Sequence, residues 1–288
     1  MAKLPVKVPE SLASKLPSAF SGDDAGVVPV VRLDGVIAAS GAGLGRANIN
    51  SESVEHPLVR AFETKDAKAV ALAINSPGGS PTQCEYIGDR IRQLADEHEL
   101  PVLAFCEDVA ASGGYWLAAA ADEIYAAPTS MVGSIGVVSG GFGFTALLDK
   151  VGVERRLYTA GDAKSRLDPF TPEKADDIAW LTELQEAVHT EFRDWVISRR
   201  PNITAENTEL FTGDVWLGRE ALRLGLIDGL GTLRTVIEKK YPGAKIMVSG
   251  PRRSIFARLG LPSARIEDVV DSVVGAANTR AAWAKYGR

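Results

Sequence analysis

The sequence predicts an α/β protein built on a mostly parallel β-sheet, and two observations carry this prediction. Short apolar runs, often β-branched and bounded by turn residues, occur at residues 27–33, 69–75, 101–106 and 123–128. Such runs are typical of strands in a sheet that is covered on both faces. Between the second and third runs, residues 81–99 carry apolar side chains at helical spacing. This pattern predicts a βαβ crossover, and therefore parallel neighbouring strands.

Two further helices are expected after the strands. Residues 171–200 carry apolar side chains at steps of three and four, with Thr171 as the expected cap and Pro172 at the first helical position. We expect this long amphipathic helix to cover the sheet. A second, shorter helix is expected within residues 218–231.

The composition excludes several classes of protein. Hydrophobic residues make up 45% and charged residues 24% of the 288 positions, which is the usual mixture of a globular protein. The net charge of −5 does not favour binding to nucleic acid. Cys84 and Cys106 cannot form a disulfide framework, and no Cys/His group has the spacing of a zinc site. We therefore expect neither a metal nor a cofactor.

The chain is expected to divide into three parts. Residues 1–26 are rich in proline and serine and predict an N-terminal arm, residues 27–240 a single domain, and residues 241–288 a C-terminal extension with a basic tail. No apolar segment precedes the first prolines, so neither a signal peptide nor a membrane anchor is expected. The uncharged stretch 124–148 is rich in glycine, serine and threonine, which favours turns and short strands over a membrane span. A cytoplasmic protein is expected, with peripheral association at the inner membrane left open.

Two glycine-rich loops are candidates for chemistry, because each follows a predicted buried strand. The first, residues 75–80 (NSPGGS), would let the backbone approach a ligand and expose N–H donors. An ordinary strand-to-helix turn is the alternative. The second, residues 109–116, places Ser112 at the start of an alanine-rich helix, where a nucleophile and its developing negative charge would be favoured. A simple helix cap is the alternative for Ser112.

A nucleophilic serine needs a base. His56, His98 and His189 each lack an obvious orienting acid and are interpreted as surface or structural histidines. A lysine can serve instead when burial favours its neutral amine. Lys164 lies among small residues in the segment GDAKS and is the candidate, although a solvated surface charge is the ordinary interpretation of a single lysine.

Taken together, these segments resemble the S49 peptidases, the signal peptide peptidase A family, and in particular its short single-domain members. The resemblance covers about residues 27–231 and rests on five segments in order: NSPGGS (75–80), ASGGYW (111–116), MVGSIGV (131–137), GDAKSRLDPFTP (161–172) and GREALRLGLIDGLG (218–231). It implies that Ser112 is the nucleophile and Lys164 the general base. It also implies an oxyanion hole from the N–H groups of Gly79 and Gly113, and a role for Ser134 in orienting the lysine.

The same resemblance implies a ClpP/crotonase-like fold of repeated ββα units and a cofactor-free serine endopeptidase acting on peptides or unfolded proteins. Such chains assemble into homo-oligomeric rings or domes, sometimes with catalytic residues from adjoining subunits. Members that degrade signal peptides commonly carry an N-terminal anchor, which these residues do not predict, so the substrate is left open. The alternatives are a phage-capsid-type maturation protease, a crotonase-fold acyl-CoA hydratase or isomerase, and a catalytically silent scaffold.

Overall fold

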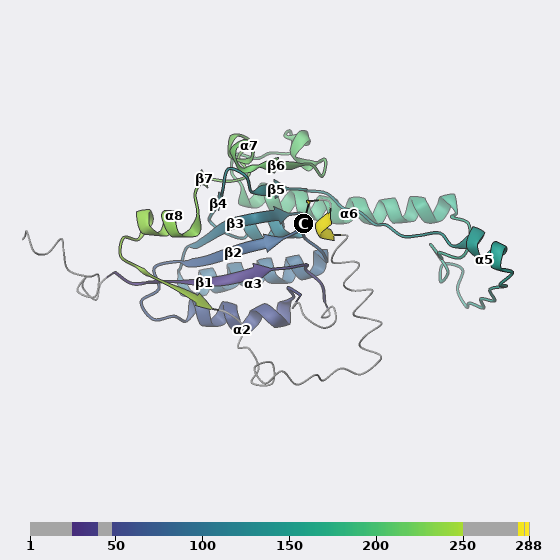
Figure 1. Cartoon of the computed structure of the whole chain (residues 1–288), viewed down its shortest axis with the longest axis horizontal. Coiled ribbons are helices and arrows are strands. Elements are labelled where there is room, and N and C mark those ends of the chain that lie inside the picture. Colours follow the sequence, from purple (N-terminus) through teal and green to yellow (C-terminus); the bar gives the residue numbers. More distant parts are fainter. Residues whose placement is uncertain (1–24, 40–47, 250–281, 285, 288) are drawn as a thin grey trace, which may run out of the picture.

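The computed structural model describes residues 25–39, 48–249, 282–284 and 286–287, and in this part of the chain one sheet carries helices on both faces (Figure 1). The strands are β1 (Val27–Asp34), β2 (Val70–Ser76), β3 (Val102–Ala111), β4 (Glu123–Ala126), β5 (Met131–Gly133), β6 (Val215–Leu217), β7 (Gly229–Leu230) and β8 (Lys245–Ser249). The helices are α2 (Ser51–Phe62), α3 (Pro81–His98), α4 (Gly113–Ala119), α5 (Thr145–Val151), α6 (Ala175–Arg199), α7 (Gly218–Arg223) and α8 (Leu233–Lys240), with a short 3₁₀ helix at Thr208–Phe211.

The sheet is mostly parallel, as the sequence predicts. Its order is β6-β5-β3-β2-β1-β8, with β4 paired to both β3 and β7. Among the paired strands, β5 and β6 run antiparallel and the other pairs are parallel. Helix α3 connects β2 to β3 as the expected crossover, so the α/β fold class is confirmed.

The core lies mainly on one face of the sheet. Strand β2 (VALAINS) is apolar and buried along nearly its whole length, because helices cover both sides of it. Helices α2, α3 and α4 pack on one face together with the C-terminal half of α6. Helix α8 packs on the other face, over apolar side chains of β1, β2 and β3.

Strand β3 has two different neighbours along the same edge, and this arrangement positions the site. Its first half, Leu103–Cys106, pairs with β4, and its second half, Val109–Ala111, pairs with β5. On the opposite edge, β3 pairs with β2, and the register shifts between Ile74 and Ser76, which pairs with Ala110. The carboxyl end of β3 is therefore held between the ends of β2 and β5.

The structure differs from the expected boundaries in two places. Helix α6 begins at Ala175, because Thr171 instead belongs to a turn in which its backbone N–H donates to the carbonyl of Asp168 at 3.2 Å. Strand β8 lies within residues 241–288, which we expected to form an extension, and it pairs in parallel with β1. The residues expected as the N-terminal arm lie outside the described part except for the last two, and Arg252, Arg253 and Arg258 of the basic tail lie outside it as well.

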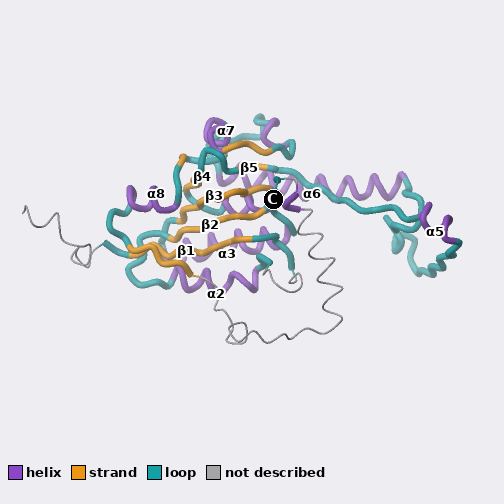
Figure 2. Tube along the Cα trace, in the orientation of Figure 1, coloured by secondary structure: helices purple, strands orange, loops and turns teal. Residues whose placement is uncertain are grey.

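Helix α6 does not cover the sheet along its whole length. Its C-terminal half buries Phe192 and Val196 against the core, whereas its N-terminal half extends away from the sheet together with α5 (Figures 1 and 2). We call residues 138–184 the projecting lobe. It carries apolar side chains that are exposed in the isolated chain, among them Val138, Phe142, Val151, Val153, Tyr158 and Leu184.

Candidate active site

Ser112 occupies a strained turn between a buried strand and a helix. Strand β3 ends at Ala111 and α4 begins at Gly113, so Ser112 alone makes the connection. Its φ of 53° and ψ of −125° are unfavourable for a residue with a side chain. Its backbone N–H donates to the carbonyl of Gly133 at 2.7 Å, which helps to hold this conformation. A sharp strand-to-helix turn of this kind presents a nucleophilic side chain at the edge of a sheet.

The capping interpretation of Ser112 can be compared directly with the geometry. Ser112 does occupy the N-cap position of α4, but within the described residues its hydroxyl makes no capping hydrogen bond. The backbone carbonyl of Ser112 instead accepts from the N–H groups of Tyr115 at 2.8 Å and Trp116 at 3.1 Å. The hydroxyl is therefore not used to begin the helix.

Gly78 and Gly79 bring the first glycine-rich loop directly against this turn. A Cβ atom at Gly78 would lie 2.7 Å from both the Cβ atom of Ser112 and the backbone nitrogen of Gly113. Gly78 has a φ of 98°, a conformation in which glycine is favoured. The two loops that the sequence singled out are thus packed together at the carboxyl ends of β2 and β3.

Ile37, just after β1, determines which way the Gly79 peptide faces. Its backbone N–H donates to the carbonyl of Gly78 at 2.9 Å, and its carbonyl accepts from the N–H of Ser80 at 2.8 Å. This is a parallel bridge, in which the N–H of the middle residue, Gly79, points to the opposite side. An ideal Cβ at Gly113 would lie 3.3 Å from the Gly79 nitrogen. The backbone nitrogen of Gly79 is therefore a close neighbour of Gly113.

Cys84 of α3 packs closely against Gly113. A Cβ atom added to Gly113 would overlap its Sγ atom, so α4 can approach α3 this closely only with glycine at position 113. Burial raises the pKa of the Cys84 thiol to about 12. The thiol is thus a neutral packing group and not a competing nucleophile.

Ser134 lies beside the same turn. It follows Gly133, whose carbonyl accepts from Ser112, and it has a φ of 53°. Its own N–H donates to the carbonyl of Asp214 at 2.6 Å, and the residue is buried. The structure therefore brings together four of the five residues singled out from the sequence: Ser112, Gly79, Gly113 and Ser134.

Lys164 is the exception. It is exposed, and it lies in the projecting lobe between α5 and α6, which Figure 1 shows well away from the ends of β2 and β3. Within the described part of the chain, Lys164 forms no hydrogen bond with Ser112. The lysine loop is fixed to α6 by the neighbouring Arg166, whose guanidinium lies 3.3 Å from the Asp177 carboxylate and stacks over Trp180.

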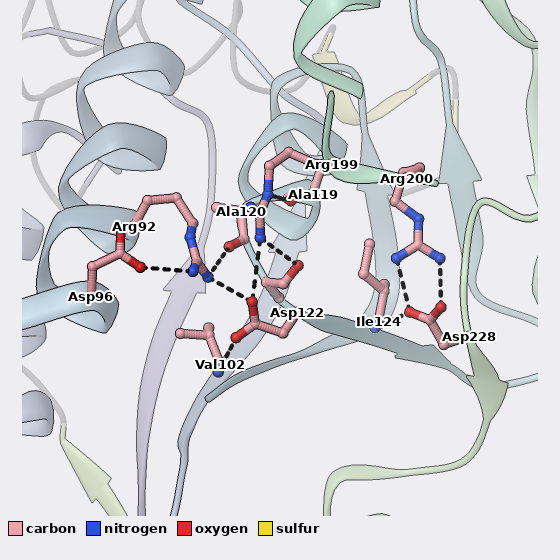
Figure 3. A network of polar contacts seen from close by, with 11 residues as sticks. Arg92, Asp96, Val102, Ala119, Ala120, Asp122, Ile124, Arg199, Arg200 and Asp228 are labelled. Carbon is pink, nitrogen blue, oxygen red and sulfur yellow. Dashed lines mark hydrogen bonds and ion pairs between the residues drawn. The ribbon is translucent and has the colours of Figure 1, made fainter. Parts of the chain in front are cut away.

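Polar contacts attach the C-terminal end of α6 to the rest of the domain. Trp195 of α6 donates from Nε1 to the carbonyl of Trp116 in α4 at 3.0 Å. Arg200, just after α6, pairs with Asp228 at 2.8 Å (Figure 3). Arg199 and Arg92 both contact Asp122. The C-terminal end of α6, opposite to the end that carries the lobe, is thus connected to the helix that begins beside Ser112.

The histidines lie elsewhere. His56 is exposed on α2, His98 is exposed at the end of α3 beside the Phe62 ring, and His189 lies on α6. Sequence reasoning missed Ile37 and Cys84. The contribution of Ile37 is made by its backbone, and that of Cys84 by its fit against a glycine, so neither leaves a recognisable sequence motif.

Within the described residues, no helix is both long and apolar enough to cross a membrane. The chain is 48% identical over 271 residues to a protein named Na(+)/H(+) antiporter NhaA from Brucella abortus, a match that covers 90% of this chain and 37% of that protein. It is 31% identical to a chloroplastic serine protease SPPA from Arabidopsis thaliana (73% of this chain, 31% of that protein). It is 29% identical to protease 4 from Haemophilus influenzae (74% of this chain, 34% of that protein).

This chain spans about a third of the length of these relatives. The family model described as peptidase family S49 matches residues 95–247, which is more than half of the chain. S49 peptidases have the ClpP/crotonase-like fold, and the sheet and helices described above are of this type. The chain belongs to peptidase family S49.

Proposed function

We propose that this chain is a serine endopeptidase in which Ser112 is the nucleophile and Lys164 of the partner subunit is the general base. The observation that carries the proposal is the strained turn at Ser112. The Ser112 hydroxyl makes no hydrogen bond to the start of α4, and Gly79 and Gly113 lie beside it. Membership of peptidase family S49 supports the same chemistry, as does the similarity to two relatives that are named as proteases.

In the proposed reaction, the neutral amine of Lys164 takes the proton from the Ser112 hydroxyl. The Ser112 oxygen then attacks the peptide carbonyl, and the N–H groups of Gly79 and Gly113 stabilise the tetrahedral oxyanion. Each such donor contributes on the order of 3 kcal/mol to stabilisation of the transition state. The lysine ammonium returns its proton to the leaving amine, and water then hydrolyses the acyl-enzyme to regenerate Ser112.

The separation of Lys164 from Ser112 within one chain supports a site completed between subunits. The lobe that carries Lys164 exposes large apolar side chains, and an apolar surface of this kind marks a contact with another molecule. A second copy of the chain is the occupant that would also explain the lysine, because the lobe would carry it to the Ser112 of its neighbour. Ser134 would then orient the incoming amine. A ring of such head-to-tail contacts would give a closed homo-oligomer.

The proposed substrates are peptides or unfolded polypeptides, including signal-peptide-like and other membrane-derived segments. An acyl-CoA enzyme of the crotonase type would not need Ser112 as a nucleophile, and a silent scaffold would use neither residue. A serine-directed phosphonate distinguishes these alternatives. We expect mass spectrometry to find the phosphonate on Ser112 in the wild-type protein and no adduct in Ser112→Ala. An unmodified Ser112 in an intact assembly would favour the scaffold.

A mixing experiment tests the location of the base. Ser112→Ala and Lys164→Ala should each abolish peptide cleavage, because the loss of one member of a catalytic unit lowers the rate nearly as much as the loss of both. When the two variants are unfolded, mixed equally and refolded, activity should return to about a quarter of wild type, because half of the sites hold Ser112 and half of those meet Lys164. Unmixed variants treated in the same way are the control. A mixture as inactive as its components would contradict a dyad between subunits.

The pH dependence tests the identity of the base. Only the neutral amine accepts a proton, so raising the pH increases the active fraction, and kcat/KM should rise between about pH 6 and pH 9. A value of kcat/KM that falls over this range, with the circular dichroism of the protein unchanged, would exclude Lys164 as the base.

A further inference from the structure

The turn that carries Lys164 is attached to the start of α6 through Asp177. Asp177 is only 8% exposed, whereas the other residues from 171 to 180 are exposed. One of its carboxylate oxygens lies 3.3 Å from the Arg166 guanidinium. The other accepts from the backbone N–H of Leu167 at 3.4 Å. One buried carboxylate therefore holds both the side chain of Arg166 and the backbone of the residue that follows it.

Trp180 adds a second contact to Arg166. The guanidinium carbon lies over the Trp180 ring, 4.9 Å from its centre. Asp177 and Trp180 are three residues apart in α6, so their side chains lie on the same side of the helix. A planar guanidinium can pair with a carboxylate and stack on an aromatic ring at the same time. These two contacts fix the orientation of the Arg166 side chain relative to α6.

The backbone of the turn connects Arg166 to Lys164. The N–H of Lys164 donates to the carbonyl of Gly161 at 3.2 Å, and the N–H of Arg166 donates to the carbonyl of Ala163 at 3.4 Å. These are two overlapping turns. Leu167 has a φ of 55°, which is unfavourable for a residue with a side chain and persists only where neighbouring contacts hold it. A simple connection between α5 and α6 would not require this strain.

We infer that Arg166 and Asp177 are positioning residues, which hold the turn so that Lys164 reaches Ser112 of the partner subunit in one orientation. This inference rests on the proposed peptidase function. The ion pair is partly exposed and should contribute little to the stability of the fold. Its effect on the rate should be much larger, because a displacement of about 1 Å in a catalytic group can lower a rate about 100-fold.

Placing Arg166→Met on one chain at a time tests this inference in mixed assemblies. In a mixture of Ser112→Ala and Lys164→Ala chains, each active site combines Lys164 from the first chain with Ser112 from the second. Arg166→Met on the Ser112→Ala chain, which supplies Lys164, should lower kcat at least about tenfold and leave KM unchanged. Arg166→Met on the Lys164→Ala chain should change neither. A general effect on the lobe or on assembly would act in both placements.

Two further variants sharpen this comparison. Arg90→Met is the matched control, because the Arg90 side chain is 29% exposed, against 32% for Arg166, and pairs with Glu55 at 2.7 Å outside the lobe. It should lower kcat in neither placement. Asp177→Ala on the chain that supplies Lys164 should also lower kcat, and adding Arg166→Met should lower it no further, because both residues act through the same turn.

Three results of the mixing experiment would overturn the inference. The first is an unchanged kcat when Arg166→Met is on the chain that supplies Lys164. The second is an equal loss in the two placements, which would show a structural role in the lobe. The third is a double variant in which the losses from Arg166→Met and Asp177→Ala multiply, since the two residues would then act independently.

Hydrogen exchange distinguishes failure of this inference from failure of the proposed function. In the full-length protein, amides of residues 161–168 should exchange at least about tenfold faster in Arg166→Met than in the wild type, and Arg90→Met should not change them. Unchanged exchange would overturn the attachment of the turn, whatever the activity. Faster exchange with an inactive mixture of Ser112→Ala and Lys164→Ala would count against the dyad between subunits alone. The kcat of the unmixed Arg166→Met enzyme, relative to wild type, would then decide the inference.

Discussion

The residues around Ser112 show how a strained backbone is maintained. Ser112 and Ser134 both have a φ of 53°, and a non-glycine residue in an unfavourable backbone conformation costs about 1–3 kcal/mol. Each is held by a backbone hydrogen bond, from Ser112 to Gly133 and from Ser134 to Asp214. Gly78, Gly79 and Gly113 then allow neighbouring segments to approach where a side chain would not fit.

A double-mutant cycle tests the packing beneath the proposed oxyanion hole. Gly113→Ala should lower kcat on the order of 100-fold, because its Cβ atom would overlap Cys84 and displace the N–H donor. Cys84→Ala removes the overlapping sulfur and should recover about tenfold of this loss when the two changes are combined. Both kcat and KM should be measured, with unfolding curves for each variant. A double variant no more active than Gly113→Ala would show that Cys84 does not limit the position of the donor.

At the scale of elements, α6 shows what periodicity can and cannot predict. The apolar spacing in residues 171–200 correctly predicted a long helix, but half of its apolar face extends away from the sheet. The position of α6 depends on the polar contacts at its C-terminal end, where buried Arg200 meets Asp228 (Figure 3). Asp228 also accepts from the backbone N–H of Ile124 at 2.7 Å, so one carboxylate connects α6 to β4.

Replacement of Arg200 should therefore destabilise the protein. Arg200→Met removes a pair whose arginine is buried, and we expect the free energy of unfolding to fall by about 1–3 kcal/mol because Asp228 keeps part of its solvation. Arg223→Met is the matched control, since Arg223 forms a solvent-exposed pair with Glu220 whose loss should lower the free energy of unfolding much less. Denaturant titration measures both changes. Equal effects would mean that the Arg200 pair does not anchor α6.

At the scale of the whole molecule, a compact domain carries an apolar lobe that its own chain leaves exposed. Phe142 and Tyr158 are both more than 80% exposed in the isolated chain, which is unusual for large apolar side chains without a partner. Lys164 lies in the same lobe. Assembly and activity should therefore depend on the same surface.

Charges placed on the lobe test this dependence. Phe142→Asp combined with Tyr158→Asp should give a monomer of 30.6 kDa and abolish cleavage, because a charge cannot be buried in an apolar contact without a partner. Light scattering and peptide cleavage measure the two effects. Tyr86→Asp, an equivalent change on the exposed side of α3, should affect neither. A fully active monomer, in the variant or in the wild type, would contradict assembly through the lobe.

The sequence by itself determined the α/β class, the parallel crossover and the two glycine-rich loops, because strand burial and loop flexibility depend on local patterns of residues. Its motifs also indicated the peptidase family. Only the tertiary structure decided that Ile37 orients the Gly79 peptide and that Cys84 packs against Gly113. These contacts join segments that are distant in the sequence. The position of Lys164 depends on how much of α6 packs on the sheet. Hydrophobic periodicity predicts the apolar face of a helix, but it does not show which part of the protein covers that face.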